Sequence, residues 1–223
     1  DGKIVSSDTG GIIRIWDVER GKGKVLRVRG DANSFNALTI TPDGKIVSGG
    51  FGDTIRIWDV EKGNVKALCG DSEDVWALAI TPDGKIVSGN KTGIIRIWDV
   101  KRGTVKLLTG SFGSIHALTV TPDGKIIFSD SNYIIRIWDV KKGKVKLLKG
   151  HTSHIEALTI TPDGKIVSCG GEKDATIRIW DVERGKVKVL SGHTDGIRAI
   201  TITPDGKIVS TGVDRTIRIW DVK

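Results

Sequence analysis

The sequence has no methionine, only two cysteines (Cys69 and Cys169), one tyrosine and no long hydrophobic run. Two cysteines exclude a disulfide scaffold and suit a reducing compartment, so we expect a cytoplasmic protein. No apolar run approaches the roughly 20 residues of a membrane span, and no signal-peptide pattern opens the chain, so we expect no membrane partner. Because complete translation products begin with methionine, we expect an excised, processed or partly recorded chain.

The sequence is rich in glycine and in repeats. It has 29 glycines in 223 residues, with 38% hydrophobic and 28% charged residues, which indicates a globular chain and excludes disorder. The string IRIWDV occurs six times, with its tryptophans 40 or 42 residues apart. The string DGK also occurs six times, and five copies follow Thr-Pro. A period near 40 residues with a Trp-Asp pair predicts propeller blades of four short strands.

Each repeat also reads as four strands from its own residues. In residues 37–48 two strands flank TPDGK, where Pro42 presets the first turn angle and Gly44 closes the turn. Residues 54–60, TIRIWDV, alternate and are β-branched, which predicts a third strand. Residues 64–70 form a fourth after the DVEKG turn. We name these strands a, b, c and d.

The strand count predicts an incomplete ring. The chain starts inside a b strand and stops after a c strand, which gives five a, six b, six c and five d strands. We therefore predict an all-β fold, a β-propeller of four-stranded antiparallel blades with about five and a half blades, as a single domain over residues 1–223. A propeller removes its sheet edges by closing its ring. Closure from unrecorded residues, from a rearranged junction, from another chain or within a larger ring stays open.

The six copies resemble the WD-repeat family of β-propellers over essentially the whole chain. The resemblance implies a scaffold for protein assembly, usually without catalysis. It also implies a hydrogen-bonded tetrad in each blade, made of His from a Gly-His pair, Ser on strand b, Asp in the b–c turn and Trp on strand c. Two repeats keep all four residues: His151, Ser168, Asp174 and Trp180, and His193, Ser210, Asp214 and Trp220. Elsewhere the pattern is broken, at Gly30-Asp31, Gly70-Asp71, Gly110-Ser111 and Phe128.

The loops at the two ends of the blades differ in kind. Successive turns of a four-stranded meander alternate between its ends. The a–b turns (TPDGK) and c–d turns (DV, two charged residues, Gly) are the same in all five copies, and we name their end the uniform face. The b–c and d–a loops differ in every copy, and we name their end the variable face. Binding or designed diversification explains this asymmetry, and the alternative is that longer loops tolerate more change than tight turns.

One position on strand a carries five different chemistries. The residue just before the strand-a alanine is Asn36, Trp76, His116, Glu156 or Arg198. The resemblance implies that this position lies around the central channel, where partners often dock. Because Trp and Arg are typical interface anchors, we predict a protein or peptide partner here. Three loop aromatics extend the candidate patch, Phe51, Phe112 and Tyr133. A core role for Trp76 and local cover of each loop aromatic remain the alternatives.

Other functions find less support in the sequence. The net charge is +8, but the repeated positions alone contribute +9, so the basic character belongs to the scaffold and we expect no specific nucleic acid. His151, His154 and Glu156 form a weak metal candidate, and since the tetrad already uses His151 we expect no metal or other cofactor. No nucleophile elbow or phosphate-binding glycine loop occurs, so we expect no enzyme.

Two further interpretations stay open. One is the sensor propeller of a larger multidomain signalling protein, and the other is an engineered repeat propeller without a ligand. The near-identical repeats favour the second, while the insertions at Lys22-Gly23 and near Gly170-Gly171 argue against a pure consensus. Homo-oligomers that complete strands between chains are a further expectation for the open ring.

Overall fold

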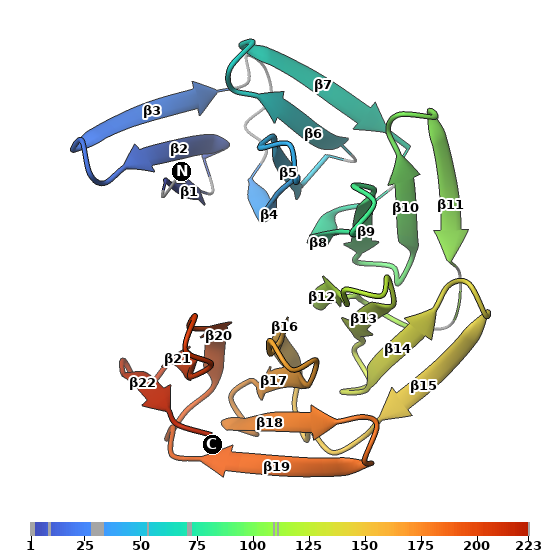
Figure 1. Ribbon diagram of the computed structural model, residues 1–223, viewed down its shortest axis with the longest axis vertical. Coiled ribbons are helices and arrows are strands. Elements are labelled where there is room, and N and C mark those ends of the chain that lie inside the picture. The colour runs from blue at the N-terminus through green and yellow to red at the C-terminus, as the bar shows by residue number, and fades with distance from the viewer. Residues whose placement is uncertain are drawn as a thin grey trace.

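The computed structural model describes residues 3–8, 10–27, 34–52, 54–70, 73–108, 110 and 112–222. Within these residues it contains 22 β-strands in six antiparallel sheets and no helix, and so none that could cross a membrane. The sheets follow one another around an open centre (Figure 1), which confirms the predicted all-β propeller. The strand count also agrees with the prediction, because the first sheet lacks strand a and the last lacks strand d.

Each sheet is one blade, and its strands are paired in chain order. Blade 1 consists of β1 (Ile4–Ser7), β2 (Ile12–Asp17) and β3 (Lys22–Arg27). Blade 2 consists of β4 (Phe35–Ile40), β5 (Ile46–Gly50), β6 (Thr54–Asp59) and β7 (Asn64–Cys69). Blade 3 consists of β8 (Val75–Ile80), β9 (Ile86–Asn90), β10 (Ile95–Asp99) and β11 (Thr104–Leu108).

The second half of the ring repeats this order. Blade 4 consists of β12 (Ala117–Val120), β13 (Ile126–Ser129), β14 (Ile135–Asp139) and β15 (Lys144–Leu148). Blade 5 consists of β16 (Ile155–Ile160), β17 (Ile166–Gly170), β18 (Thr176–Asp181) and β19 (Lys186–Ser191). Blade 6 consists of β20 (Ile197–Ile202), β21 (Ile208–Gly212) and β22 (Ile217–Trp220). The strands named a (β4, β8, β12, β16, β20) contact one another in succession around the centre (Figure 1).

Neighbouring blades are joined by one repeated apolar layer. Side chains alternate along a strand, so the two isoleucines of each IRIW segment face one side of the blade and its tryptophan faces the other. Between blades 1 and 2, Ile13 and Ile15 pack with Trp58. The same Ile-against-Trp contact recurs at the next four junctions, where the tryptophans are Trp98, Trp138, Trp180 and Trp220. Each buried isoleucine contributes about 1.5–3 kcal/mol, so these layers hold the blades together.

The TPDGK turns give the uniform face its regular shape. In the first copy the Gly44 N–H donates to the Thr41 carbonyl at 2.9 Å, and Gly44 has φ = 80°. The Thr41 hydroxyl and the Lys45 ammonium both donate to the Asp43 carboxylate, at 2.5 and 2.6 Å. Both hydrogen bonds lower the pKa of Asp43, and the one from Lys45 contributes more than the one from Thr41. The turn predicted from Pro42 and Gly44 is therefore confirmed.

At the two ends of the row of blades, the side chains that would form one half of an Ile–Trp layer are exposed. Figure 1 shows an opening between blade 1 and blade 6, and no strand of one pairs with a strand of the other within the described residues. In blade 6 Ile217 and Ile219 are 72% and 69% exposed, whereas Ile177 at the same repeat position in blade 5 is fully buried. In blade 1 Trp16 is 42% exposed. Burial of the repeated core residues therefore depends on a neighbouring blade.

We predict that Ile177→Ala and Ile217→Ala have very different effects, although both lie in the same TIRIW context. Ile177→Ala leaves a cavity in a filled layer and lowers the free energy of unfolding by about 2–5 kcal/mol. Ile217→Ala removes an exposed side chain and changes it by less than about 0.5 kcal/mol. Chemical denaturation of both variants measures the difference. Equal losses would show that blade 6 is covered in solution.

Candidate functional site

The strand-a position with five chemistries lies at a break in strand pairing. Between β4 and β5 the register shifts between Phe35 and Ala37, so Asn36 is the extra residue. The same shift occurs at Trp76, Glu156 and Arg198 in blades 3, 5 and 6. In blade 4 His116 lies directly before the first residue of β12. A bulge takes one side chain out of the regular alternation and re-aims it, so these residues need not pack between blades.

Aromatic and imidazole rings form a continuous row across blades 3 to 5. The rings of Trp76 and His116 have their centroids 5.0 Å apart, and those of His116 and His154 are 4.8 Å apart. Tyr133 meets His154 edge-on at 5.0 Å. Trp76, His116 and His154 are all half-buried, while Tyr133 is exposed. The structure therefore brings three of the predicted residues into one row and adds His154 to it.

The row continues into a charged group from blades 5 and 6. The Arg198 guanidinium lies 3.3 Å from the Glu156 carboxylate and 3.2 Å from that of Glu172. The Arg198 side chain is 52% exposed, so this ion-pair network is open to solvent. Exposed pairs of this kind contribute little to stability, which leaves their charges available to a partner.

Burial affects the chemistry of the row. The pKa of His116 is lowered, first by burial and then by the neighbouring His154, against the opposing effects of Glu156 and Asp130. The Nδ1 atom of His154 is buried and has no hydrogen-bond partner among the residues that the structure describes. Burial thus disfavours the charged form of the His116 imidazole.

The remaining predicted residues take three different places. Asn36 is exposed, and its Nδ2 donates to the Val75 carbonyl at 3.5 Å. Phe51 is 49% exposed, and no ring contact joins it to the row within the described part of the chain. Tyr133 adopts φ = 62° at the b–c turn position that Gly93 occupies in blade 3. A bulky residue rarely adopts this conformation, and here it holds the Tyr133 ring against His154.

Phe112 was expected to extend the patch, and that expectation is wrong. Its ring is only 8% exposed and lies 5.1 Å from Phe128 and 5.8 Å from Trp138. The Arg136 guanidinium lies 5.0 Å from its centroid. Phe128 stands where other blades carry the strand-b serine, and since it cannot accept a hydrogen bond the loop folds an aromatic ring over it. Phe112 therefore belongs to the core of blade 4.

The structure brings together both sets of four residues named as tetrads. In blade 5 His151 lies 2.9 Å from Asp174 through Nδ1 and 2.7 Å from the Ser168 hydroxyl through Nε2. Trp180 Nε1 donates to the same hydroxyl at 2.8 Å. In blade 6 the matching distances are 2.7, 2.7 and 2.8 Å, among His193, Asp214, Ser210 and Trp220. Each chain of donors is complete when the histidine carries its proton on Nδ1.

The other blades keep parts of this arrangement. Trp16, Trp58 and Trp98 donate to the strand-b serines Ser6, Ser48 and Ser88 at 2.9–3.0 Å. The replacements Asp31, Asp71 and Ser111 lie outside the described residues. In blade 3 Asn90 Oδ1 accepts from the Thr92 and Ile94 N–H groups, which closes the b–c turn without histidine. The Trp-to-Ser bond therefore does not need the histidine.

Asp174 is held as a carboxylate. Burial raises its pKa, but hydrogen bonds from His151, from Thr176 and from the Thr152 N–H outweigh burial, and its pKa lies well below the usual range. Asp214 is lowered in the same way by Thr216, His193 and the N–H groups of Thr216 and Thr194. These carboxylates are occupied by internal contacts, which is the arrangement of a structural group.

Metal and thiol chemistry find no assembled site. Within the described ranges no group of three or more His, Cys, Asp or Glu residues could hold a metal ion. Both cysteines are free, Cys69 exposed on β7 and Cys169 buried on β17, in different blades. Burial raises the pKa of Cys169 to about 12, so that thiol is not a nucleophile at neutral pH.

Comparison with protein families agrees with this geometry. The profile described as "WD domain, G-beta repeat" matches five stretches, residues 23–59, 63–99, 103–139, 142–181 and 184–221. The chain belongs to the WD40 repeat family. Proteins of this family are generally non-catalytic scaffolds for protein–protein interaction. No individual curated protein matches the chain.

Two residues of this WD40 surface escaped prediction as partner-binding residues. His154 lies in the d–a loop GHTSHIE, one of the loops that differ between repeats, and a search limited to the position before alanine passes over it. Glu172 lies in the b–c loop CGGEKDA, the longest of its kind. That extra length is the sequence signal for a residue that reaches across to the next blade.

We predict that the tetrad serine stabilises the protein only where it is buried. Ser168→Ala leaves Trp180 Nε1 and His151 Nε2 buried without partners and lowers the free energy of unfolding by about 1–3 kcal/mol. Ser6→Ala is the matched control in blade 1, where the bonded Trp16 is exposed and water replaces the hydroxyl, so we expect less than about 0.5 kcal/mol. Urea unfolding of both variants gives the comparison, and equal losses contradict it.

We predict that Asp174 makes stability fall as the pH falls. Its pKa is depressed in the folded state, so its contribution is complete above the ordinary value of 3.8 and is lost progressively below it. Asp174→Asn is less stable at pH 7 but loses less additional stability between about pH 5 and pH 2.5. Urea midpoints across this range measure the slope. Parallel slopes for variant and parent would contradict the assignment.

Proposed function

We propose that this WD40 propeller is a non-catalytic scaffold that holds a protein or peptide partner on its variable face. The residues proposed to contact the partner are Asn36, Trp76, His116, Glu156 and Arg198, together with His154 and Glu172. The observation that supports this most strongly is that one repeat position, out of regular pairing in four blades, carries a different chemistry in each blade.

The chemistry of the surface suggests the kind of partner segment. The rings of Trp76, His116 and His154 offer a half-buried flat surface, which suits an apolar or aromatic side chain. Arg198 between Glu156 and Glu172 offers charges of both signs beside it. A segment with an apolar anchor and a neighbouring charged residue would use both halves, with Trp76 and Arg198 as the anchors.

Compartment and oligomeric state belong to the same proposal. Two free cysteines in separate blades are compatible with a reducing cytoplasm, and we place the scaffold there. The uncovered end faces of blades 1 and 6 support strand or blade completion by further chain or by another copy.

We predict that Trp76→Ala combined with Arg198→Ala abolishes partner capture and leaves the circular dichroism spectrum unchanged. Loss of one anchor weakens such interfaces by about 2 kcal/mol, roughly 30-fold in Kd. The partner is first isolated by affinity capture on the parent protein, and its Kd is then measured by calorimetry.

The matched control removes an apolar and a charged side chain far from the variable face. Val187→Ala with Lys188→Ala changes two exposed residues on the outer strand β19. It should leave the Kd within about twofold of the parent. Unchanged capture by the Trp76 and Arg198 double variant would overturn the proposed function.

A further inference from the structure

The uniform face carries a cavity at the junctions between blades. At the junction of blades 3 and 4 the cavity measures about 490 Å³, and at blades 2 and 3 about 570 Å³. A third of about 310 Å³ lies between blades 5 and 6. Cavities of 300–1,000 Å³ are the size of ordinary ligand sites. We call the first two the 3/4 groove and the 2/3 groove.

The walls of each groove are apolar and stiff. In the 3/4 groove the TPDGK turns of both blades contribute Pro82 and Pro122, and Ile97, Ile126 and Val140 complete the apolar lining. Proline rings and strand isoleucines lose little freedom when a ligand is bound. The 2/3 groove repeats this lining with Pro42, Pro82, Ile57, Ile86 and Val100. Both grooves are therefore preformed by the repeat itself.

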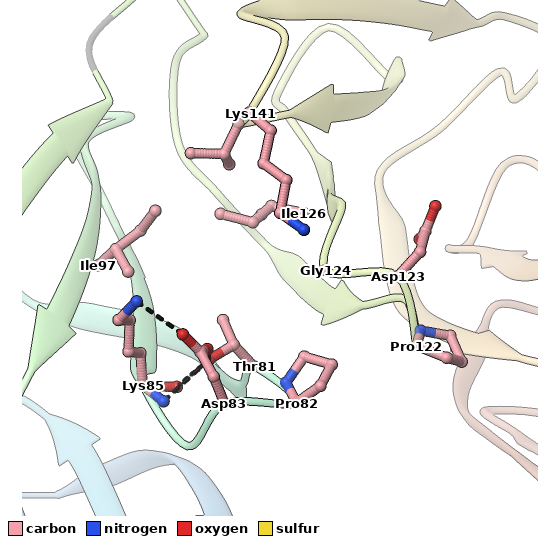
Figure 2. A pocket seen from close by; sticks show the side chains of 11 residues that line it. Thr81, Pro82, Asp83, Lys85, Ile97, Pro122, Asp123, Gly124, Ile126 and Lys141 are labelled. Atoms are coloured by element: carbon pink, nitrogen blue, oxygen red, sulfur yellow. Dashed lines mark hydrogen bonds and ion pairs between the residues drawn. The ribbon is translucent and has the colours of Figure 1, made fainter.

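Most charges at the rim already neutralise one another. Lys85 lies 2.6 Å from the Asp83 carboxylate, and Lys125 lies 2.5 Å from that of Asp123. The Thr81 hydroxyl also donates to Asp83 at 2.5 Å. The turn aspartates are thus occupied within their own turns, as the bonds drawn at Asp83 in Figure 2 illustrate.

Each groove keeps at least one lysine side chain without a partner among the described residues. Lys141 follows Val140 in the c–d turn of blade 4, is exposed, and has no ion pair or hydrogen bond within the described residues. Figure 2 shows its side chain reaching from that turn toward Ile126. Lys101 holds the same place in the 2/3 groove and is likewise exposed and unpaired there. In the 2/3 groove Lys62 and Lys66 are also exposed and have no side-chain ion pair or hydrogen bond within the described residues. Each groove thus combines an apolar wall with unneutralised positive charge.

Not every blade carries a lysine at this position of the c–d turn. Blade 5 carries Glu183 where blades 3 and 4 carry Lys101 and Lys141, and its charge acts on Lys125 across the junction of blades 4 and 5. The junction of blades 4 and 5 therefore has the same repeated turns, but it has a negative charge at the position where the two grooves have a lysine. The equivalent residue of blade 6, Lys223, lies outside the described residues.

We propose that the 2/3 and 3/4 grooves each bind a short peptide segment of a partner protein that pairs an apolar side chain with an acidic one. The apolar side chain fills the space between the prolines and isoleucines, and the carboxylate pairs with Lys101 or Lys141. The two grooves are neighbours on one face, so a chain with two such segments occupies both and gains effective concentration from the link. This site lies on the face opposite to the proposed partner surface and does not depend on it.

A labelled peptide of alternating leucine and glutamate tests the proposal on the full chain. Calorimetry should show binding of this peptide, and the otherwise identical leucine–glutamine peptide should bind at least tenfold more weakly, because a charge-assisted bond is lost. Lys101→Glu with Lys141→Glu should weaken glutamate-peptide binding at least tenfold. Lys106→Glu with Lys188→Glu, on the outer strands, makes the same change in net charge and should leave the affinity within about twofold.

A gain-of-function variant separates the groove from general attraction. Glu183→Lys should raise the number of peptide sites by one relative to the parent protein. Trp76→Ala with Arg198→Ala should leave peptide binding unchanged, so failure of one site is distinguishable from failure of the other. Equal binding of the two peptides, equal effects of the two lysine pairs, or an unchanged number of sites in Glu183→Lys would each overturn the proposal.

Discussion

The structure depends on the contact of an isoleucine pair from one blade with the tryptophan of the next. Since every IRIW segment has isoleucines on one side and tryptophan on the other, every blade offers both halves of the same contact. Five such layers fill the junctions of the arc. A single blade buries neither half, which is why Ile217 and Trp16 are exposed at the ends while their counterparts are buried. The blades are stable through their neighbours, as in other repeat proteins.

This dependence leaves the two ends of the blades free for different tasks. On the uniform face the TPDGK turns are tied internally, with threonine and lysine both donating to aspartate. These bonds fix the turn between the first two strands of each blade, and the same turns place prolines beside the grooves. On the variable face the bulged strand-a residues do not take part in the Ile–Trp packing between blades. Sequence change there alters the surface without disturbing the Ile–Trp layers.

Most buried polar groups inside the blades have a hydrogen-bond partner, and within the described residues His154 Nδ1 and Arg178 Nε are the exceptions. Blades 5 and 6 contain complete chains of hydrogen bonds from Trp through Ser and His to Asp. Blade 4 lacks the tetrad, because Phe128 replaces serine and Phe112 packs over it, but it keeps the buried Asp130 carboxylate, which accepts from Arg136. Both arrangements fit the same four-stranded blade. Loss of a tetrad in the sequence therefore does not imply a loose blade.

The sequence by itself determined the strands, their order and the two faces, because the period near 40 residues, the turn chemistry and the β-branched alternation are all local signals. It also identified the strand-a position, since repeats reveal departures from their own template, and the resemblance to the WD-repeat family identified both tetrads. Only the tertiary structure decided that Trp76 joins His116 and His154 in one row, that Glu172 reaches Arg198, and that Phe112 is buried. The grooves belong to the same class. They are built from residues about 40 positions apart that meet only when two blades stack, and no local pattern encodes the space left between them.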